Sequence, residues 1–187
     1  MEALIGVLSG DGIGPEVTTE AVRVLKAVGS HHGHRFRFQA GLIGGAAIDA
    51  EGAAFPEATR QLCADADAIL LGAVGGPKWS SPDALVRPEQ GLLDMRAAMG
   101  VYANLRPVIT HPALYASSPL KAERLSGVDI LVIRELTGGI YFGRKERSAT
   151  SATDVCTYSR SEIERVLRMA GRLAMQRRRK VTSVDKA

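Results

Sequence analysis

The stretch Ala3-Leu4-Ile5-Gly6-Val7-Leu8, followed at once by Ser9-Gly10-Asp11-Gly12-Ile13-Gly14-Pro15, decides the fold of this 187-residue chain. Its first six residues form a short apolar run that ends in a glycine turn, which is typical of a buried strand. Pro15 is favoured at the start of a helix, because its missing N–H needs no partner there. Apolar residues recur at helical spacing up to Val28, and Gly29 is the predicted end of the helix.

The same alternation of strands and helices continues through the first hundred residues. Residues 35–40 alternate like a half-exposed strand, a glycine-rich turn is expected at 44–45, a helix over 56–66 and a buried strand over 68–71. Strands that alternate with helices predict a parallel sheet with crossover connections. We therefore expect an α/β chain whose first domain, on the cofactor side, covers residues 1–101.

The pattern changes near residue 100. A helix is expected over residues 89–99 and strands over 102–108 and 128–136. Residues 140–158 combine glycines with β-branched and aromatic residues, which predicts an antiparallel hairpin or arm. We assign residues 102–187 to part of a second, substrate-binding and dimer-forming α/β domain.

A further helix follows the predicted arm. Ser159 and Glu162 have the spacing of a capping box. The helix has an apolar face at helical spacing, formed by Ile163, Val166, Leu167, Ala170, Leu173 and Ala174. The basic run 177–180 is expected to end this helix, where cations complement the helix dipole. Residues 181–184 are expected to begin one more strand.

Composition excludes several classes of protein. The hydrophobic fraction of 45% and the charged fraction of 24% fit a globular protein and not a disordered one. No aromatic residues interleave with the basic run 177–180, so we expect no nucleic-acid partner. Cys63 and Cys156 lack CxxC spacing, which favours a reducing compartment. No apolar run approaches the ~20 residues of a membrane span and no signal pattern opens the chain, so a cytoplasmic location is expected.

Two glycine-rich loops, 10–14 and 72–77, follow predicted strands. Glycines there allow a backbone to approach a phosphate or cofactor closely. The first loop has G-x-G-x-G spacing and not the G-x-G-x-x-G of a dinucleotide fingerprint, and the strand 35–40 ends without an acidic residue for a ribose. A tight turn and a ligand loop therefore remain equally open readings of the spacing.

Three histidines, His31, His32 and His34, are expected in a loop after the first helix. No cysteine or carboxylate stands near them at ligand spacing, so they do not predict a metal site.

Three arginines stand next to apolar or glycine-rich segments. Arg96 lies on a predicted helix, while Arg106 and Arg134 belong to predicted strands. An arginine at the end of a buried strand needs a partner, and guanidinium groups bind carboxylates in a bidentate way. The set indicates either a site for a di- or tricarboxylate or three structural salt bridges. Tyr141, between glycines, is either a proton donor or a core residue.

Six motifs in order along the chain resemble the β-decarboxylating dehydrogenases of isopropylmalate, isocitrate and tartrate. The motif Gly10-Asp11-Gly12-Ile13-Gly14-Pro15-Glu16-Val17 is similar to the opening motif of that family. The other motifs span residues 72–79, 88–96, 103–107, 134–143 and 183–187, and they are similar to the isopropylmalate branch. Ordered motifs over the whole chain are far more specific than one glycine loop.

The resemblance implies roles for particular side chains. Arg96, Arg106 and Arg134 would hold the malate carboxylates. Tyr141 would protonate the enolate that decarboxylation leaves, and Lys186 would assist proton removal from the substrate hydroxyl in the neighbouring subunit's site.

Other roles implied by the resemblance concern the substituent and the cofactor. Glu89, Leu92 and Leu93 would face the substrate's γ-substituent and the nicotinamide. The cofactor-binding residues would be Ile13, Gly75, Gly76 and Glu89. Leucines suit an isopropyl group and would leave a third carboxylate of isocitrate buried and unpaired.

The implied reaction is the NAD-dependent oxidation and decarboxylation of 3-isopropylmalate to 2-oxoisocaproate in leucine biosynthesis, with Mg²⁺ or Mn²⁺. No metal ligand is assigned within this chain, because the family takes its metal-binding aspartates from a later segment. The resemblance also implies a homodimer, and a first domain completed by returning C-terminal chain. We therefore expect a fragment that is inactive alone. The alternatives are a non-catalytic binding or regulatory homologue, and a tartrate or isocitrate relative.

Overall fold

The computed structural model describes residues 1–81 and 84–184 and divides the chain into two compact units, Met1–Gly100 and Val101–Ala187. The first unit contains a parallel sheet, whereas the strands of the second unit pair in antiparallel fashion. The predicted α/β class with parallel and antiparallel parts is confirmed.

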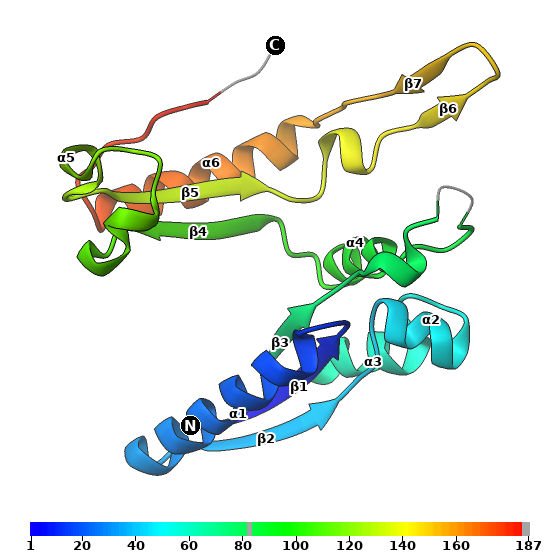
Figure 1. Cartoon of the computed structure of the whole chain (residues 1–187), viewed down its shortest axis with the longest axis horizontal. Helices are drawn as coiled ribbons and strands as arrows, with labels where there is room; N and C mark the ends of the chain where they lie inside the picture. Colours follow the sequence, from blue (N-terminus) through cyan, green and yellow to red (C-terminus); the bar gives the residue numbers. More distant parts are fainter. Residues whose placement is uncertain (82–83, 185–187) are drawn as a thin grey trace. The chain divides into compact units, whose positions relative to one another are not determined.

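Three strands form the sheet of the first unit: β1 (Glu2–Gly10), β2 (Arg35–Ala40) and β3 (Ala68–Ala73). Their order is β2-β1-β3, and both pairs are parallel (Figure 1). The earliest strand in the sequence is therefore the central one. This position explains why its residues form an apolar run without polar alternation.

Helices cover both faces of this sheet. Helix α1 (Gly14–His32) packs on the face to which Ser9 points, since the Ser9 and Thr18 hydroxyls are 2.9 Å apart. Helix α3 (Glu57–Asp65) packs on the opposite face, where Leu8 and Leu62 share the core. Successive side chains of a strand point to opposite faces, so these contacts place the two helices on either side of the sheet.

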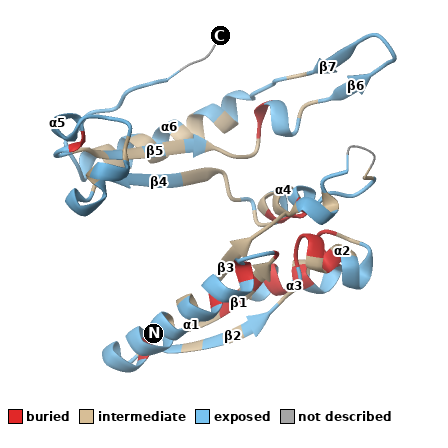
Figure 2. Cartoon of the chain, viewed as in Figure 1, coloured by how far each residue is buried: buried red, intermediate tan, exposed pale blue. Residues whose placement is uncertain are grey.

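The core of the first unit lies between β1, α3 and α4 (Pro88–Ala98) (Figure 2). Its buried members are Leu8, Ile43, Phe55, Leu62, Cys63 and Met95. Helix α4 approaches closely because position 91 is glycine: a Cβ atom there would lie 2.2 Å from the Ala54 carbonyl oxygen. The burial of Cys63 raises the pKa of its thiol. This core therefore fixes α4, the helix that carries several predicted site residues.

The end of α1 differs from the prediction. The helix continues to His32, and Gly33, with φ of 66°, is the left-handed residue that ends it. His31 and His32 therefore lie in its last turn and not in a loop. Gly29 is needed for packing, because a Cβ atom there would lie 3.0 Å from the His34 carbonyl oxygen. A glycine that permits close packing was mistaken for a helix stop.

Helix α2 (Gly45–Glu51) was predicted only as a glycine-rich turn. It is seven residues long and no side chain within the helix caps it. The 3-10 helix η1 (Pro77–Trp79) follows β3 and leads towards α4. Both elements are too short for periodicity to reveal them.

In the second unit, β4 (Ala103–Ile109) pairs with β5 (Asp129–Glu135), and α6 (Arg160–Met175) packs on β5. The connection between the strands holds the 3-10 helix η2 (Pro112–Ser117) and the short helix α5 (Ala122–Leu125). The Ser159–Glu162 capping box is present as predicted, with both reciprocal hydrogen bonds.

The predicted arm is an antiparallel hairpin of β6 (Lys145–Arg147) and β7 (Ala152–Asp154), preceded by the 3-10 helix η3 (Gly139–Tyr141). The strand expected at 181–184 was wrong, since these residues have no regular structure. The basic run lies beyond the end of α6, and Arg177 and Arg178 bond to Asp129 instead. An apolar segment forms a strand only where its backbone N–H and C=O groups pair with those of a neighbouring strand.

Candidate functional site

The two glycine-rich loops lie side by side at the carboxyl ends of β1 and β3. These strands are neighbours, and Gly10 is paired with Ala73 at their ends. The N–H of Asp11 donates to the Ala73 carbonyl oxygen at 2.7 Å, which joins the loops directly. Ligands of parallel α/β sheets bind outside the carboxyl ends of the strands. This edge is therefore the candidate nucleotide site of the first unit.

Asp11 organises this edge. Its side chain is 4% exposed and accepts hydrogen bonds from the backbone N–H groups of Gly45, Ala46 and Gly75, at 2.8, 2.7 and 2.7 Å. One carboxylate thus ties the first glycine loop to the start of α2 and to the loop after β3. Sequence analysis treated Asp11 as part of a motif without a role of its own.

Gly75 also contacts Glu89, the first of the predicted site residues on α4. A Cβ atom at Gly75 would lie 2.6 Å from Oε1 of Glu89, and the φ of Gly75 is 103°. A side chain at this position is therefore excluded by both space and backbone conformation. The predicted cofactor residues Gly75 and Glu89 lie together. Ile13, at 56% exposure, belongs to the neighbouring loop of the same edge.

Helix α4 separates core residues from candidate site residues. Positions 89, 93 and 96 share one face, because they are three and four residues apart. Leu93 and Arg96 are half-buried and Glu89 is exposed. Leu92 packs against the core cluster, so part of its surface serves packing.

The loop after β3 is held from a second side by Asp49 of α2. Its carboxylate accepts from Lys78 Nζ at 2.6 Å and from Trp79 Nε1 at 3.1 Å. The hydrogen bonds from Lys78 and Trp79 lower the pKa of Asp49. The Trp79 ring lies against Gly45, where a Cβ atom would approach it to 2.4 Å. The position of Gly76, just before η1, is fixed as a result.

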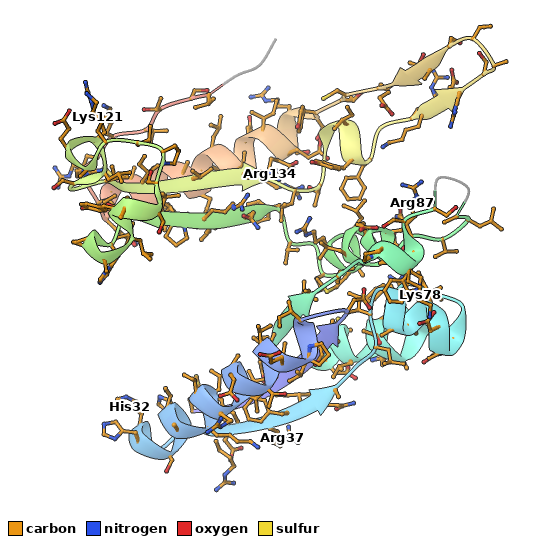
Figure 3. All side chains as sticks on the ribbon, viewed as in Figure 1. His32, Arg37, Lys78, Arg87, Lys121 and Arg134 are labelled. Atoms are coloured by element: carbon orange, nitrogen blue, oxygen red, sulfur yellow. The ribbon has the colours of Figure 1, made fainter. Side chains whose placement is uncertain are left out.

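In the second unit, Arg106 and Arg134 lie on the same face of the β4–β5 pair. The register pairs Arg106 with Val132, and Val132 precedes Arg134 by two positions, so all three side chains share one face. Both arginines are exposed, and Figure 3 labels Arg134 near the end of β5. The other face carries the half-buried Leu131 and Ile133 of β5, the strand against which α6 packs.

Arg134 also holds Tyr141. Its Nη2 donates to the Tyr141 hydroxyl oxygen at 2.8 Å, and its guanidinium carbon lies 5.2 Å from the centre of the ring. A guanidinium can only donate, so the phenol oxygen is the acceptor in this bond and its own proton remains to be donated elsewhere. Tyr141 is 52% exposed, which excludes the core reading for it.

Glu135, next to Arg134, points to the opposite face and shapes the following turn. It accepts from the Thr137 N–H at 2.9 Å, the Thr137 hydroxyl at 2.7 Å and the Gly138 N–H at 2.8 Å. Arg165 of α6 bonds to Thr137 and lies 3.5 Å from Glu135. Burial raises the pKa of Glu135, but the hydrogen bonds from Thr137 and Gly138 outweigh it and leave the pKa below its usual range.

The structure thus forms two groups of predicted residues, one in each unit. Glu89, Leu92, Leu93 and Arg96 accompany the glycine loops in the first unit. Arg106, Arg134 and Tyr141 gather in the second unit. Lys186 lies outside the described residues. Asp11 and Glu135 were missed, although each is a carboxylate beside a glycine turn.

Within residues 1–81 and 84–184, no group of three histidine, cysteine or carboxylate side chains has the geometry to hold a metal ion. No helix in that part of the chain is long and apolar enough to cross a membrane.

Comparison with known families and curated proteins gives a consistent result. The family model for isocitrate/isopropylmalate dehydrogenase matches residues 4–187. A 3-isopropylmalate dehydrogenase of Bacillus caldotenax is 56% identical, covering 98% of this chain and 51% of the relative. One of Anaeromyxobacter dehalogenans is 57% identical, covering 100% of this chain and 54% of the relative. The chain spans about half the length of the curated relatives it matches.

Solved structures show the same relationship. The apo β-decarboxylating dehydrogenase of Thermococcus kodakarensis has a TM-score of 0.62 at 33% identity, covering 92% of this chain and 46% of the other. The isocitrate dehydrogenase of Methylococcus capsulatus has a TM-score of 0.74 at 25% identity, covering 92% of this chain and 48% of the other.

Proposed function

Because this chain belongs to the isocitrate/isopropylmalate dehydrogenase family, we propose that it provides substrate- and cofactor-binding residues of an NAD-dependent enzyme that converts 3-isopropylmalate to 2-oxoisocaproate. The observation that carries the proposal is the exposed Arg134–Tyr141 pair with Arg106 on the same sheet face. The hydrogen bond between Arg134 and Tyr141 places a carboxylate-binding group next to a proton donor.

The arginines bind the substrate. Arg106 and Arg134 present guanidinium groups on one exposed face, where each can form paired hydrogen bonds to a malate carboxylate. Arg96, on α4, is proposed as the third carboxylate-binding arginine. The paired hydrogen bonds of Arg106 and Arg134 hold the substrate in a single orientation, which is required before a hydrogen can leave the hydroxyl-bearing carbon.

Tyr141 supplies the proton that completes the reaction. Once the substrate alcohol has become a ketone and carbon dioxide has left, the carbon that lost it must gain a proton. The hydrogen bond from Arg134 to the phenol oxygen leaves the Tyr141 O–H free to donate to that carbon. The same bond disperses the negative charge that the phenolate then carries.

The first unit is proposed to bind the nucleotide. Gly75 and Gly76 lie without side chains at the carboxyl edge of the sheet, beside Glu89, and Ile13 exposes an apolar side chain there. An apolar surface beside open backbone suits a flat base and a ribose. NAD, when bound, supplies the oxidising power by accepting a hydride.

The family also implies a divalent metal, Mg²⁺ or Mn²⁺. The described residues do not fit such an ion, since they offer no cluster of three ligating side chains. The roles proposed for Lys186 and for a homodimer in leucine biosynthesis belong to the complete enzyme.

Isopropylmalate is favoured over isocitrate as the substrate. Leu93 is an apolar side chain on the α4 face that also carries Arg96. Since Arg96 is proposed to bind a malate carboxylate, a third carboxylate beside Leu93 would have no cationic partner of its own. The relatives called 3-isopropylmalate dehydrogenase are 56% and 57% identical to this chain, whereas the isocitrate dehydrogenase structure is 25% identical.

Calorimetric titration of the chain with 3-isopropylmalate tests the proposal. We expect binding, and a loss of affinity of about tenfold or more in Arg134→Ala, since a hydrogen bond between charged groups contributes ~1.5–3 kcal/mol. Arg147→Ala, which removes an exposed arginine of β6, is the matched control and should bind normally. Equal binding by Arg134→Ala, or tighter binding of isocitrate than of 3-isopropylmalate, contradicts the proposal.

A coupled assay separates the enzyme from a non-catalytic binding protein. With 3-isopropylmalate, NAD and Mg²⁺, the 187-residue chain should form negligible NADH. A version extended to the full length of its relatives should form NADH, and Tyr141→Phe in that version should lower kcat more than it changes KM. An extended version that binds substrate but never forms NADH would establish the binding-protein alternative.

A further inference from the structure

We propose that Asp11 is a positioning residue: its carboxylate acts as an internal anion that accepts hydrogen bonds from the backbone N–H groups of Gly45, Ala46 and Gly75, and thereby holds Gly75 beside Glu89. The nucleotide-binding consequence rests on the proposed function. The effect on loop geometry does not.

The contacts of Asp11 are those of a bound anion. Oδ2 accepts from the N–H of Gly45 and of Gly75, and Oδ1 accepts from the N–H of Ala46. Converging backbone N–H groups of this kind form concave anion sites in proteins. Here the anion belongs to the chain itself and is almost completely buried. Such charge-assisted bonds are stronger than those between neutral groups.

The surrounding glycines are adapted to this carboxylate. A Cβ atom at Gly44 would lie 2.5 Å from Oδ2 of Asp11, and Gly44 has a φ of 75°. The backbone before α2 therefore lies so close to the Asp11 carboxylate that residue 44 has no room for a side chain. Gly10, with φ of 70°, would place a Cβ atom 2.0 Å from the Ala73 carbonyl oxygen. The first loop is thus fitted to the end of β3, and the segment before α2 is fitted to the aspartate of that loop.

This arrangement removes three backbone N–H groups at the edge from phosphate binding. In phosphate-binding glycine loops, free backbone N–H groups receive the phosphate oxygens. The N–H groups of Gly45, Ala46 and Gly75 already bond to Asp11, so they are not free for a pyrophosphate. The Gly75 N–H of the second loop and the first two N–H groups of α2 then serve to shape the edge against which a nucleotide lies, and these three groups do not bind its phosphates.

The influence of Asp11 extends to Glu89 through Gly75. The Gly75 N–H bonds to Asp11 on one side, and the Gly75 α-carbon faces the Glu89 carboxylate on the other. Release of the Gly75 N–H would let the loop after β3 move and would change the space beside Glu89. We therefore assign Asp11 an effect on ligand affinity and not only on stability.

The test compares Asp11→Asn with Asp67→Asn. Asp67 is the matched control, because its carboxylate accepts the Leu4 N–H at 2.7 Å near the start of β3, at the opposite edge of the sheet. In Asp11→Asn, the NH₂ group of the new side chain must face a backbone N–H donor in a buried place. In Asp67→Asn the side chain is exposed, so water can accept the hydrogen bond that the carboxylate accepted before. Both variants are measured well below their unfolding temperatures.

Two measurements are made on the same samples. Hydrogen exchange by NMR should show that Gly45, Ala46 and Gly75 lose protection together in Asp11→Asn and keep it in Asp67→Asn. NADH titration should show an affinity loss of about tenfold in Asp11→Asn, as expected for one charge-assisted hydrogen bond, and no change in Asp67→Asn.

The outcomes separate the two proposals. If the unaltered chain does not bind NADH, the nucleotide role of the first unit fails, and the exchange measurement still tests Asp11. If the unaltered chain binds NADH and Asp11→Asn binds it equally well, or if the three amides stay protected in that variant, the inference is overturned. If Asp11→Asn does not fold, hydrogen exchange is measured on the unaltered chain with and without NADH. Slower exchange of all three amides when NADH binds supports the link between Asp11 and nucleotide binding. Amides that change independently of one another contradict it.

Discussion

The two units of this chain are stabilised in different ways. The first unit has a compact apolar core around Leu8 and Leu62, whereas within the described residues Leu125 is the single buried apolar side chain of the second. The second unit depends on the β4–β5 ladder, the Glu135 turn and one face of α6. Figure 2 shows this contrast in the distribution of buried residues. The apolar pattern of a sequence therefore predicts which residues can be buried, but not how many are.

Helix α6 illustrates the difference. Its apolar positions recur as predicted, yet none of its residues is buried, and Ile163 and Leu167 remain 45% and 55% exposed. The remaining members of the predicted face, Val166, Ala170, Leu173 and Ala174, are half-buried. An amphipathic helix of this kind contributes less to stability than α4, whose Met95 is buried.

Leu8→Ala should have the largest effect and would test the contrast most directly. Leu8 is fully buried, so the change should lower the free energy of unfolding of the first unit by ~2–5 kcal/mol. Fluorescence of Trp79, the only tryptophan of the chain, reports urea unfolding of that unit. The matched change Leu167→Ala in α6 should lower the free energy of unfolding of the second unit by less than about 1 kcal/mol, because Leu167 is 55% exposed. Equal losses from the two changes would show that the second unit has a comparable core.

Glu135→Gln should have an intermediate effect, confined to the second unit. The amide cannot accept every N–H and O–H that the carboxylate does, so we expect a loss of ~1–3 kcal/mol, and increased hydrogen exchange at Thr137 and Gly138. Glu146→Gln in β6 is an exposed control and should have almost no effect. An unchanged exchange rate at Gly138 would show that the turn does not depend on Glu135.

The same residue predicts a pH dependence. Hydrogen bonds lower the pKa of Glu135 in the folded unit below its usual 4.5, so the folded state binds this proton more weakly than the unfolded chain. Its stabilisation is therefore complete above about pH 4.5 and is lost as the pH falls through the lower, folded-state pKa. Acid titration of the second unit by NMR should show this loss, and Glu135→Gln should remove it. A loss that begins above pH 6 would point to another group.

Ser159→Ala should have the smallest effect of the series. It removes the capping box of α6, which costs ~1 kcal/mol in comparable helices. Because α6 has no buried residue to compensate, its first turn should fray, and this is measurable as faster exchange of the Glu162 and Ile163 amides. Ser183→Ala, at an exposed position outside α6, is the control. An unchanged exchange rate of the Ile163 amide would show that packing on β5 alone stabilises the first turn of α6.

Much of the fold could be predicted from local patterns. The apolar run at β1, the alternation over β2 and the periodicity of α1 each depend on neighbouring residues, and the structure confirms these elements. The capping box of α6 was predictable for the same reason, since Ser159 and Glu162 are three positions apart. Short-range sterics and hydrogen bonding determine such features wherever the segment lies in the fold.

Local patterns failed where a distant contact decides the structure. Residues 181–184 have the residue types of a strand but form no regular structure. Helix α2 is the opposite case, because the groups that satisfy its first N–H donors come from Asp11, 34 and 35 positions earlier in the chain. Neither outcome can be calculated from the segment alone.

The candidate site divides in the same way. The residue types of Arg106, Arg134 and Tyr141, and the family motifs around them, were readable from the sequence. That the two arginines share a face and that Arg134 donates to Tyr141 became known only from the β4–β5 register and the return of the chain through η3. The hydrogen bond from the Gly75 N–H to the Asp11 carboxylate is a second example, because these residues are 64 positions apart in the sequence. Sequence determines the available groups and their local elements, whereas only the folded chain brings distant donors and acceptors to within 3 Å, because hydrogen bonds require that proximity.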